Sequence, residues 1–142
     1  MKKKIFSTIL IVTFGVSLFA QETESKWSAG ADVVSSYVWR GLKLSNAAFQ
    51  PSVGFTSNGF SAGAWGSADF NGDFLEADLF AAYAFDFGLS LGITDYYFPT
   101  SSAGSDYFEY GKEFGAHAFE LNAGYEISGF SLAANYIFNE AG

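Results

Sequence analysis

The sequence contains no cysteine, which excludes disulfide scaffolds, zinc fingers, iron–sulfur clusters and thiol catalysis. Basic residues are scarce: seven Lys and Arg face fifteen Asp and Glu, and a formal charge of -8 argues against binding to nucleic-acid phosphates. Beyond the extreme N-terminus, no apolar run reaches the roughly 18 residues that a membrane-spanning helix needs. The chain is nevertheless 49% hydrophobic and 20% aromatic, which is too apolar for a disordered protein. Its aromatic side chains therefore need another kind of apolar environment.

The N-terminus has the three parts of a secretory signal peptide. Lys2, Lys3 and Lys4 form a basic start, residues 5–19 are largely apolar, and Ala20 precedes a polar segment. A single membrane anchor is the weaker alternative, because the run is short and no stop-transfer flank follows it. We expect cleavage after Ala20 and a short periplasmic segment at residues 21–26. Cleavage would remove three basic residues and no acidic one, so the mature chain would be more acidic still.

From Trp27 onward, apolar residues alternate with small or polar ones, the period-two pattern of β-strands. The ten steps from Trp27 to Tyr37, at about 3.3 Å each and tilted by about 40°, would cover about 25 Å, the apolar height of an outer-membrane barrel. Asp95 breaks the pattern on the expected lipid side, so we expect its strand to bulge or end early. The pattern occurs in seven segments, 27–40, 49–56, 60–70, 75–86, 89–94, 119–127 and 130–139.

The connections between these segments are of two kinds. Three are tight turns that end in Gly59, Gly88 and Gly129, whereas others, above all residues 99–115, are longer. Short turns at one end and longer loops at the other are typical of bacterial outer-membrane barrels. We therefore predict an all-β fold, an antiparallel up-and-down transmembrane β-barrel domain over 27–142. Such barrels have an even number of strands, so we expect an N-terminal fragment of a larger barrel, or else an eighth strand at 107–112.

Three short motifs together resemble those of one bacterial family. They are Tyr-x-x-Arg-Gly at 37–41, Trp-Gly-Ser at 65–67 and Glu-Ala-Asp at 76–78. Ser35-Ser36 stands where the family pattern has Ser-Asp. The family is the Gcw_chp domain of unknown function, also known as the TorF family of porin-like proteins, and the resemblance extends from Trp27 to the C-terminus. It implies a barrel in the bacterial outer membrane and a pore, but no particular solute.

The alternation places charged side chains on the face that would line the barrel lumen. An acidic lining would favour cations; the alternative is that these residues only keep the lumen solvated. The single arginine, Arg40, is better explained as the partner of an acidic wall residue such as Asp69 or Asp78 than as a solute contact. The expected lumen residues are Asp32, Arg40, Asp69, Glu76, Asp78, Glu120 and Glu126.

The opposite face would carry the aromatic girdles that anchor a barrel at the two membrane interfaces. Trp65 has the inward register instead, where packing against the wall is a simpler role than stacking on a solute. The expected girdle residues are Trp27, Tyr37, Trp39, Phe60, Phe85 and Tyr125.

Candidate sites for chemistry are few. His117 is the only histidine, and no Gly-x-Ser-x-Gly motif accompanies it, so we predict no enzyme activity, no cofactor and no metal. Glu76 and Asp78 would lie about 7 Å apart on one face of a strand, a geometry that suits metal or acid–base chemistry but has no other support in the sequence. Calcium could also bind acidic loop residues, namely Asp106, Glu109 and Glu113.

Two functions from different classes follow. The first is a porin that lets small solutes or ions diffuse passively through the outer membrane, with a preference for cations. The second is a structural or surface-interaction barrel with a plugged lumen, whose loop 99–115 contacts partners. In both, the barrel wall contacts outer-membrane lipid, and the protein does not bind nucleic acid. A soluble periplasmic sandwich is a distant third interpretation.

Overall fold

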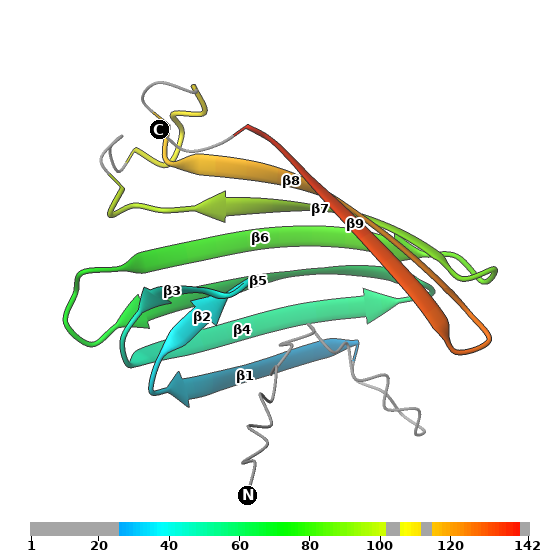
Figure 1. Cartoon of the computed structure of the whole chain (residues 1–142), viewed down its shortest axis with the longest axis horizontal. Coiled ribbons are helices and arrows are strands. Elements are labelled where there is room, and N and C mark those ends of the chain that lie inside the picture. Colours follow the sequence, from blue (N-terminus) through cyan, green and yellow to red (C-terminus); the bar gives the residue numbers. More distant parts are fainter. Residues whose placement is uncertain (1–25, 102–105, 112–114, 140–142) are drawn as a thin grey trace, which may run out of the picture.

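The computed structural model describes residues 26–101, 106–111 and 115–139, and this part of the chain consists mainly of β-strands (Figure 1). Within it, no helix is long and apolar enough to cross a membrane. The signal peptide expected at 1–20 lies outside the described residues. The strands are β1 (Trp27–Val34), β2 (Tyr37–Trp39), β3 (Leu42–Ser45), β4 (Ala48–Ser57), β5 (Phe60–Asp69), β6 (Leu75–Ala84), β7 (Leu89–Tyr97), β8 (His117–Ile127) and β9 (Phe130–Asn139).

Seven of these strands form one antiparallel sheet in the order β1-β4-β5-β6-β7-β8-β9. From β4 to β9, each strand pairs with its neighbour in the chain, which confirms the antiparallel meander predicted from the alternation. The tight turns lie at one end of the sheet and the longer connections at the other (Figure 1). Across the described strands, β1 and β9 are the two edges and do not pair with each other, so the sheet is open.

The first segment differs from the prediction of one strand over 27–40. The chain leaves the sheet after Val34, and Val34 pairs directly with Ala48 at the start of β4. Between them, β2 and β3 form a separate two-stranded hairpin. Its turn residues, Arg40 and Gly41, both have positive φ, 47° and 85°, which is the backbone of a tight type I′ hairpin turn. Alternation has the same period in one long strand and in a short hairpin, so the sequence pattern could not separate them.

The alternative eighth strand at 107–112 is not found in the part of this segment that the structure describes. Residues 106–111 form turns, with the Glu109 amide donating a hydrogen bond to the Asp106 carbonyl. The expectation that the strand of Asp95 bulges or ends early is also wrong, because β7 continues to Tyr97 and keeps a regular register with β6 and β8. A polar partner described below explains why Asp95 is tolerated there.

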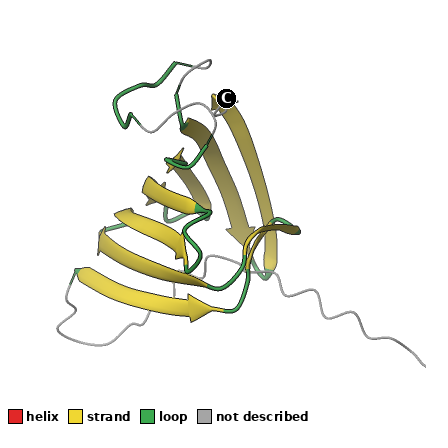
Figure 2. Cartoon of the chain, turned by 90° about the vertical axis from the view of Figure 1, so that its left-hand side faces the viewer, coloured by secondary structure: helices red, strands yellow, loops and turns green. Residues whose placement is uncertain are grey.

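The sheet is strongly curved and therefore has a concave and a convex face (Figure 2). The concave face carries the small and polar residues of the alternation. Across the described residues, only four hydrophobic residues are buried, against eight polar or charged ones, which is the reverse of a soluble protein's core. The buried polar residues of the concave face are Gln50, Ser67, Asp69, Glu76, Asp78 and Glu120.

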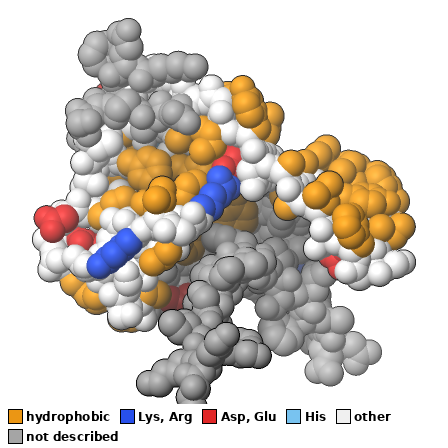
Figure 3. Space-filling view, viewed as in Figure 1, with side chains coloured by type: hydrophobic (Ala, Val, Ile, Leu, Met, Phe, Trp, Pro, Cys, Tyr) orange, Lys and Arg blue, Asp and Glu red, His pale blue; other side chains and the backbone are white. Residues whose placement is uncertain are grey.

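The convex face carries large apolar side chains that are exposed. Leu79 and Leu121 are each 49% exposed, and Tyr136 is 66% exposed. In the space-filling view, hydrophobic side chains gather over the edge of the sheet that β9 forms (Figure 3). Continuous exposed apolar surface of this kind marks an interaction with a membrane or with another protein. The fold thus presents apolar groups outward and charged groups inward.

Gly88 fixes the tight turn between β6 and β7, and its replacement by alanine should destabilise the fold. Gly88 has φ of 94°, and a Cβ there would overlap the Glu126 carbonyl. Gly72 also has positive φ, 79°, but nothing lies within 4 Å of an added Cβ. We expect Gly88→Ala to lower the free energy of unfolding by about 3 kcal/mol and Gly72→Ala by about 1 kcal/mol. Urea denaturation measures both; equal losses would contradict the predicted overlap.

Candidate functional site

The β2–β3 hairpin lies against the concave face of the sheet, as aromatic contacts show. The ring of Tyr37 lies 5.4 Å from that of Trp65 on β5 and 5.9 Å from that of Phe74. At the tip, the Trp39 ring lies 5.9 Å from that of Tyr96 on β7. The prediction that Tyr37 and Trp39 belong to an outer girdle is therefore wrong, because the chain leaves the sheet before it reaches them.

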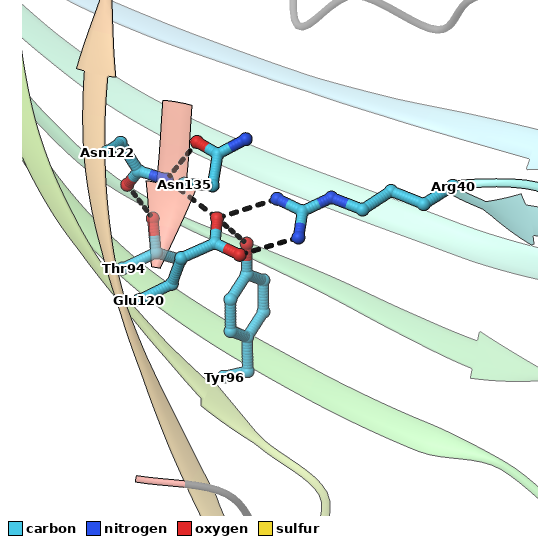
Figure 4. Close-up of polar contacts among 6 residues, drawn as sticks. All are labelled: Arg40, Thr94, Tyr96, Glu120, Asn122 and Asn135. Carbon is cyan, nitrogen blue, oxygen red and sulfur yellow. Dashed lines mark hydrogen bonds and ion pairs between the residues drawn. The ribbon is translucent and has the colours of Figure 1, made fainter. Parts of the chain in front are cut away.

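Arg40, at the tip of the hairpin, forms an ion pair with Glu120 on β8 (Figure 4). Two contacts of 2.7 Å join the guanidinium to the carboxylate, one to each carboxylate oxygen. Glu120 is fully buried, whereas the Arg40 side chain is 43% exposed and packs over the ring of Trp39 at 4.2 Å. The hydrogen bond to Glu120 raises the pKa of Arg40 above its usual value. The pair connects the hairpin, which lies between β1 and β4 in the chain, with β8, which is four positions from β4 in the sheet.

The Glu120 carboxylate is held by further donors from neighbouring strands (Figure 4). The Tyr96 hydroxyl donates to Oε1 at 3.2 Å, and Nδ2 of Asn122 donates to the same oxygen at 2.6 Å. Asn122 in turn accepts a hydrogen bond from Thr94 at 3.0 Å and donates one to Asn135 on β9 at 3.0 Å. A network across β7, β8 and β9 therefore fixes the position of this carboxylate.

A second group of acidic residues lies on β6 beneath the hairpin. Glu76 and Asp78 are 3% and 7% exposed. Burial raises the pKa of Tyr37, and the charge of the nearby Glu76 carboxylate raises it further. Asp78 lies opposite Trp65 on one neighbouring strand and Tyr96 on the other. Aromatic rings and the hairpin thus separate these two carboxylates from solvent.

The other expected lumen residues have different surroundings. Asp69, at the end of β5, accepts hydrogen bonds from the Asp73 and Phe74 amides, so it stabilises the β5–β6 turn. Asp32 and Glu126 are exposed and lie outside the network around Glu120. The structure thus brings together Arg40 with Glu120, and Glu76 with Asp78, but leaves the remaining three apart.

The other expected girdle residues lie near the end of the sheet that has the tight turns. Trp27 is 66% exposed and lies 5.0 Å from the Phe55 ring, and Phe60 is 41% exposed. Phe85 and Tyr125 are each 37% exposed. These aromatic residues lie near the ends of strands, Phe85 directly after β6, so exposed rings occupy one rim of the sheet.

On the convex face, His117 forms a buried polar cluster that sequence reasoning missed. Its Nδ1 lies 2.7 Å from the Asp95 carboxylate, and its Nε2 lies 2.8 Å from the Tyr107 carbonyl. The rings of Tyr97 and Tyr110 lie 4.7 and 4.5 Å from the imidazole. The shared outward register of residues 95 and 117 on adjacent strands was the available signal. The cluster attaches the β7–β8 loop to the sheet and gives an outward-facing carboxylate a polar partner.

Replacing His117 with leucine should loosen this loop. The change leaves the Asp95 carboxylate and the Tyr107 carbonyl without their imidazole partner, which we expect to cost about 3 kcal/mol. Limited proteolysis within residues 98–116 and urea denaturation test the prediction. The double variant Asp95→Asn/His117→Leu should recover part of the loss; unchanged protease resistance in His117→Leu would contradict it.

The remaining candidates are the acidic loop residues that could bind calcium. Within the described ranges, no group of three or more His, Cys, Asp or Glu residues is placed to hold a metal ion. The loop carboxylates of Asp106 and Glu109 accept hydrogen bonds from the Phe108 and Gly111 amides, as expected in turns. The third loop acid, Glu113, lies outside the described residues.

The comparisons with known proteins identify a family but no activity. Residues 20–139 match the family described as "Bacterial protein of unknown function (Gcw_chp)". Neither a curated protein nor a solved structure shows a significant match. The match covers most of the chain and every strand of the curved sheet. The chain belongs to the Gcw_chp family of bacterial proteins.

Proposed function

We propose that this chain forms wall strands of a bacterial outer-membrane β-barrel that acts as a porin of the TorF type. The observation that carries the proposal is the reversed polarity of the sheet. Buried residues of the concave face include Glu76, Asp78 and Glu120, whereas large apolar side chains of the convex face are exposed. In a membrane, that arrangement gives lipid an apolar surface and gives a lumen a polar one.

Three further features support this proposal. Tight turns are grouped at one end of the sheet, as expected for the periplasmic side. Exposed aromatic rings at the same end suit a membrane interface. In hydrocarbon, the free edges of β1 and β9 would leave backbone groups unsatisfied, so both edges would pair with additional strands. The signal peptide expected at 1–20 would direct export.

In such a barrel, the β2–β3 hairpin would narrow the lumen. It lies against the concave face, and Arg40 and Glu120 neutralise each other at its tip. The other expected lining charges are all acidic, and Asp32 and Glu126 among them are exposed, so the passage would favour small cations over anions. The solutes would be small, because the hairpin occupies part of the cross-section.

A plugged structural barrel is the second candidate, and the same hairpin favours it. The two-contact ion pair connects the hairpin to β8, and the hairpin would block flux if it stayed in this position. In that case, the barrel would serve as a scaffold for surface contacts through the β7–β8 loop.

Liposome swelling separates the two functions. Folded protein is reconstituted in vesicles that contain a sugar or a salt, and the rate of swelling is measured. A porin gives swelling that falls with solute size, whereas a plugged barrel gives none. Reversal potentials under a KCl gradient then test the charge preference, for which we expect cations. Flotation of the protein with vesicles tests membrane insertion, and protein that stays soluble without detergent would contradict both barrel proposals.

A further inference from the structure

Glu76 and Asp78 are buried carboxylates with free oxygen atoms. They lie two residues apart on β6 and face the same side, about 7 Å apart along the strand. Oε2 of Glu76 and Oδ1 of Asp78 are both inaccessible to solvent, and neither has a hydrogen-bond partner within the described residues. An unpaired carboxylate that leaves water is strongly destabilised unless a positive charge or a proton accompanies it.

No basic side chain of the described residues supplies this charge. Arg40 is paired with Glu120, and the other ion pair joins His117 to an aspartate on β7. Lys43, on the hairpin, donates instead to the Asn46 side chain at 2.7 Å. The two buried carboxylates of β6 therefore have no basic partner among these side chains beneath the hairpin.

The surroundings of these carboxylates offer oxygen donors. The Tyr37 hydroxyl lies close to the Glu76 carboxylate. Ser67, opposite Glu76 on β5, is 1% exposed, and its hydroxyl lies 3.2 Å from the Gln50 amide. Carboxylates and hydroxyls are hard ligands, which suit hard cations and do not favour soft metals such as copper(I).

We propose that Glu76 and Asp78 form a binding site for a hard divalent cation of the Ca²⁺ class, held beneath the β2–β3 hairpin. One divalent ion balances the two carboxylates. Ca²⁺ accepts irregular sets of six to eight oxygens, whereas Mg²⁺ requires a near-ideal octahedron. Two carboxylates and nearby hydroxyls, completed by carbonyl groups or water, therefore suit Ca²⁺ better. The site does not depend on transport.

Thermal unfolding of the folded full chain in detergent micelles tests the site without any measurement of flux. The melting temperature is compared in EDTA, CaCl2, MgCl2 and NaCl at matched ionic strength. We expect saturating CaCl2 to raise Tm by about 5–10 °C. MgCl2 should have a smaller effect, and NaCl should have none. Equal melting temperatures in EDTA and CaCl2 would overturn the proposal and leave protons as the neutralising species.

A pair of double variants locates the effect. Glu76→Gln/Asp78→Asn should abolish the calcium-dependent shift, and in EDTA it should melt no lower than the wild type, because its carboxamides need no counter-charge. Asp86→Asn/Glu126→Gln removes two acids that are exposed, and it should keep the full shift. A shift that persists in the β6 variant would place the ion elsewhere and overturn the proposal.

A direct measurement on the wild type covers the case in which the β6 variant fails to fold. Tb³⁺ replaces Ca²⁺ at oxygen sites. Trp65 is paired with Asp78 across β5 and β6, so its indole can sensitise the luminescence of a Tb³⁺ ion bound there. We expect saturable Tb³⁺ luminescence on excitation of tryptophan and its loss on addition of CaCl2. Absence of saturable luminescence would contradict the site, whatever the outcome of liposome swelling.

Discussion

Arg40→Met should lower the free energy of unfolding by about 3 kcal/mol, because it leaves the carboxylate of Glu120 buried without its counter-charge. Glu120 has no solvent exposure, so water cannot take the place of the guanidinium. Methionine keeps much of the apolar contact that the Arg40 side chain makes with Trp39, so the loss reports mainly on charge. Urea denaturation, followed by the fluorescence of the three tryptophans, measures the change.

Lys43→Met is the matched control for this prediction. Lys43 is the other basic residue of the hairpin, and its ammonium group donates an exposed hydrogen bond to Asn46. Its replacement should change stability by less than about 0.5 kcal/mol. In the double variant Arg40→Met/Glu120→Gln, the buried charge is absent, and part of the loss should be recovered. If Arg40→Met were as stable as Lys43→Met, the ion pair would not hold the hairpin.

The alternation predicted the sheet well because its period follows directly from the pleat. In a strand with one polar face, successive side chains point to opposite sides, so Leu79 and Asp78 had to lie on opposite faces wherever the strand paired. The same logic placed Glu120 on the concave face. The number of strands in the sheet, their order and most of their ends followed from the pattern alone.

The hairpin escaped prediction because local alternation carries no information about which strand is the partner. Tyr37 and Trp39 alternate with smaller residues in either arrangement. The useful signal was the Arg40-Gly41 pair between two short alternating runs, because glycine readily adopts the positive φ of a tight turn. Without the hairpin, the burial of Glu76 could not be inferred, since burial there depends on Tyr37 from a distant part of the chain.

The candidate site was likewise predicted only in part. The sequence singled out Glu76 and Asp78 by their spacing and Arg40 as the partner of an unspecified acid. It suggested Asp69 or Asp78 for that acid, whereas the structure pairs Arg40 with Glu120. That pairing joins residues 80 positions apart and depends on the curvature of the whole sheet, which no local pattern encodes.

Removal of the β2–β3 hairpin should increase conductance several-fold if the chain forms the wall of a pore. Val34 and Ala48 are paired across β1 and β4, so a two-residue Asn-Gly turn can replace residues 35–47 without a change of register. The hairpin packs on the concave face through Trp39 and Tyr37, and its loss would widen the passage at that position. Single-channel recording in planar bilayers measures the change, and larger sugars should also enter liposomes.

The outcome depends on a sheet that remains folded, which circular dichroism and resistance to urea establish. Trp39→Ala/Arg40→Met is a milder variant, because it keeps the hairpin but removes both tip contacts with Tyr96 and Glu120. We expect it to give a noisier current with brief steps toward the level of the hairpin deletion, since the tip can leave the wall. Lys43→Met, with those contacts intact, should conduct as the wild type does. A folded deletion variant with wild-type conductance would show that the hairpin does not narrow the passage.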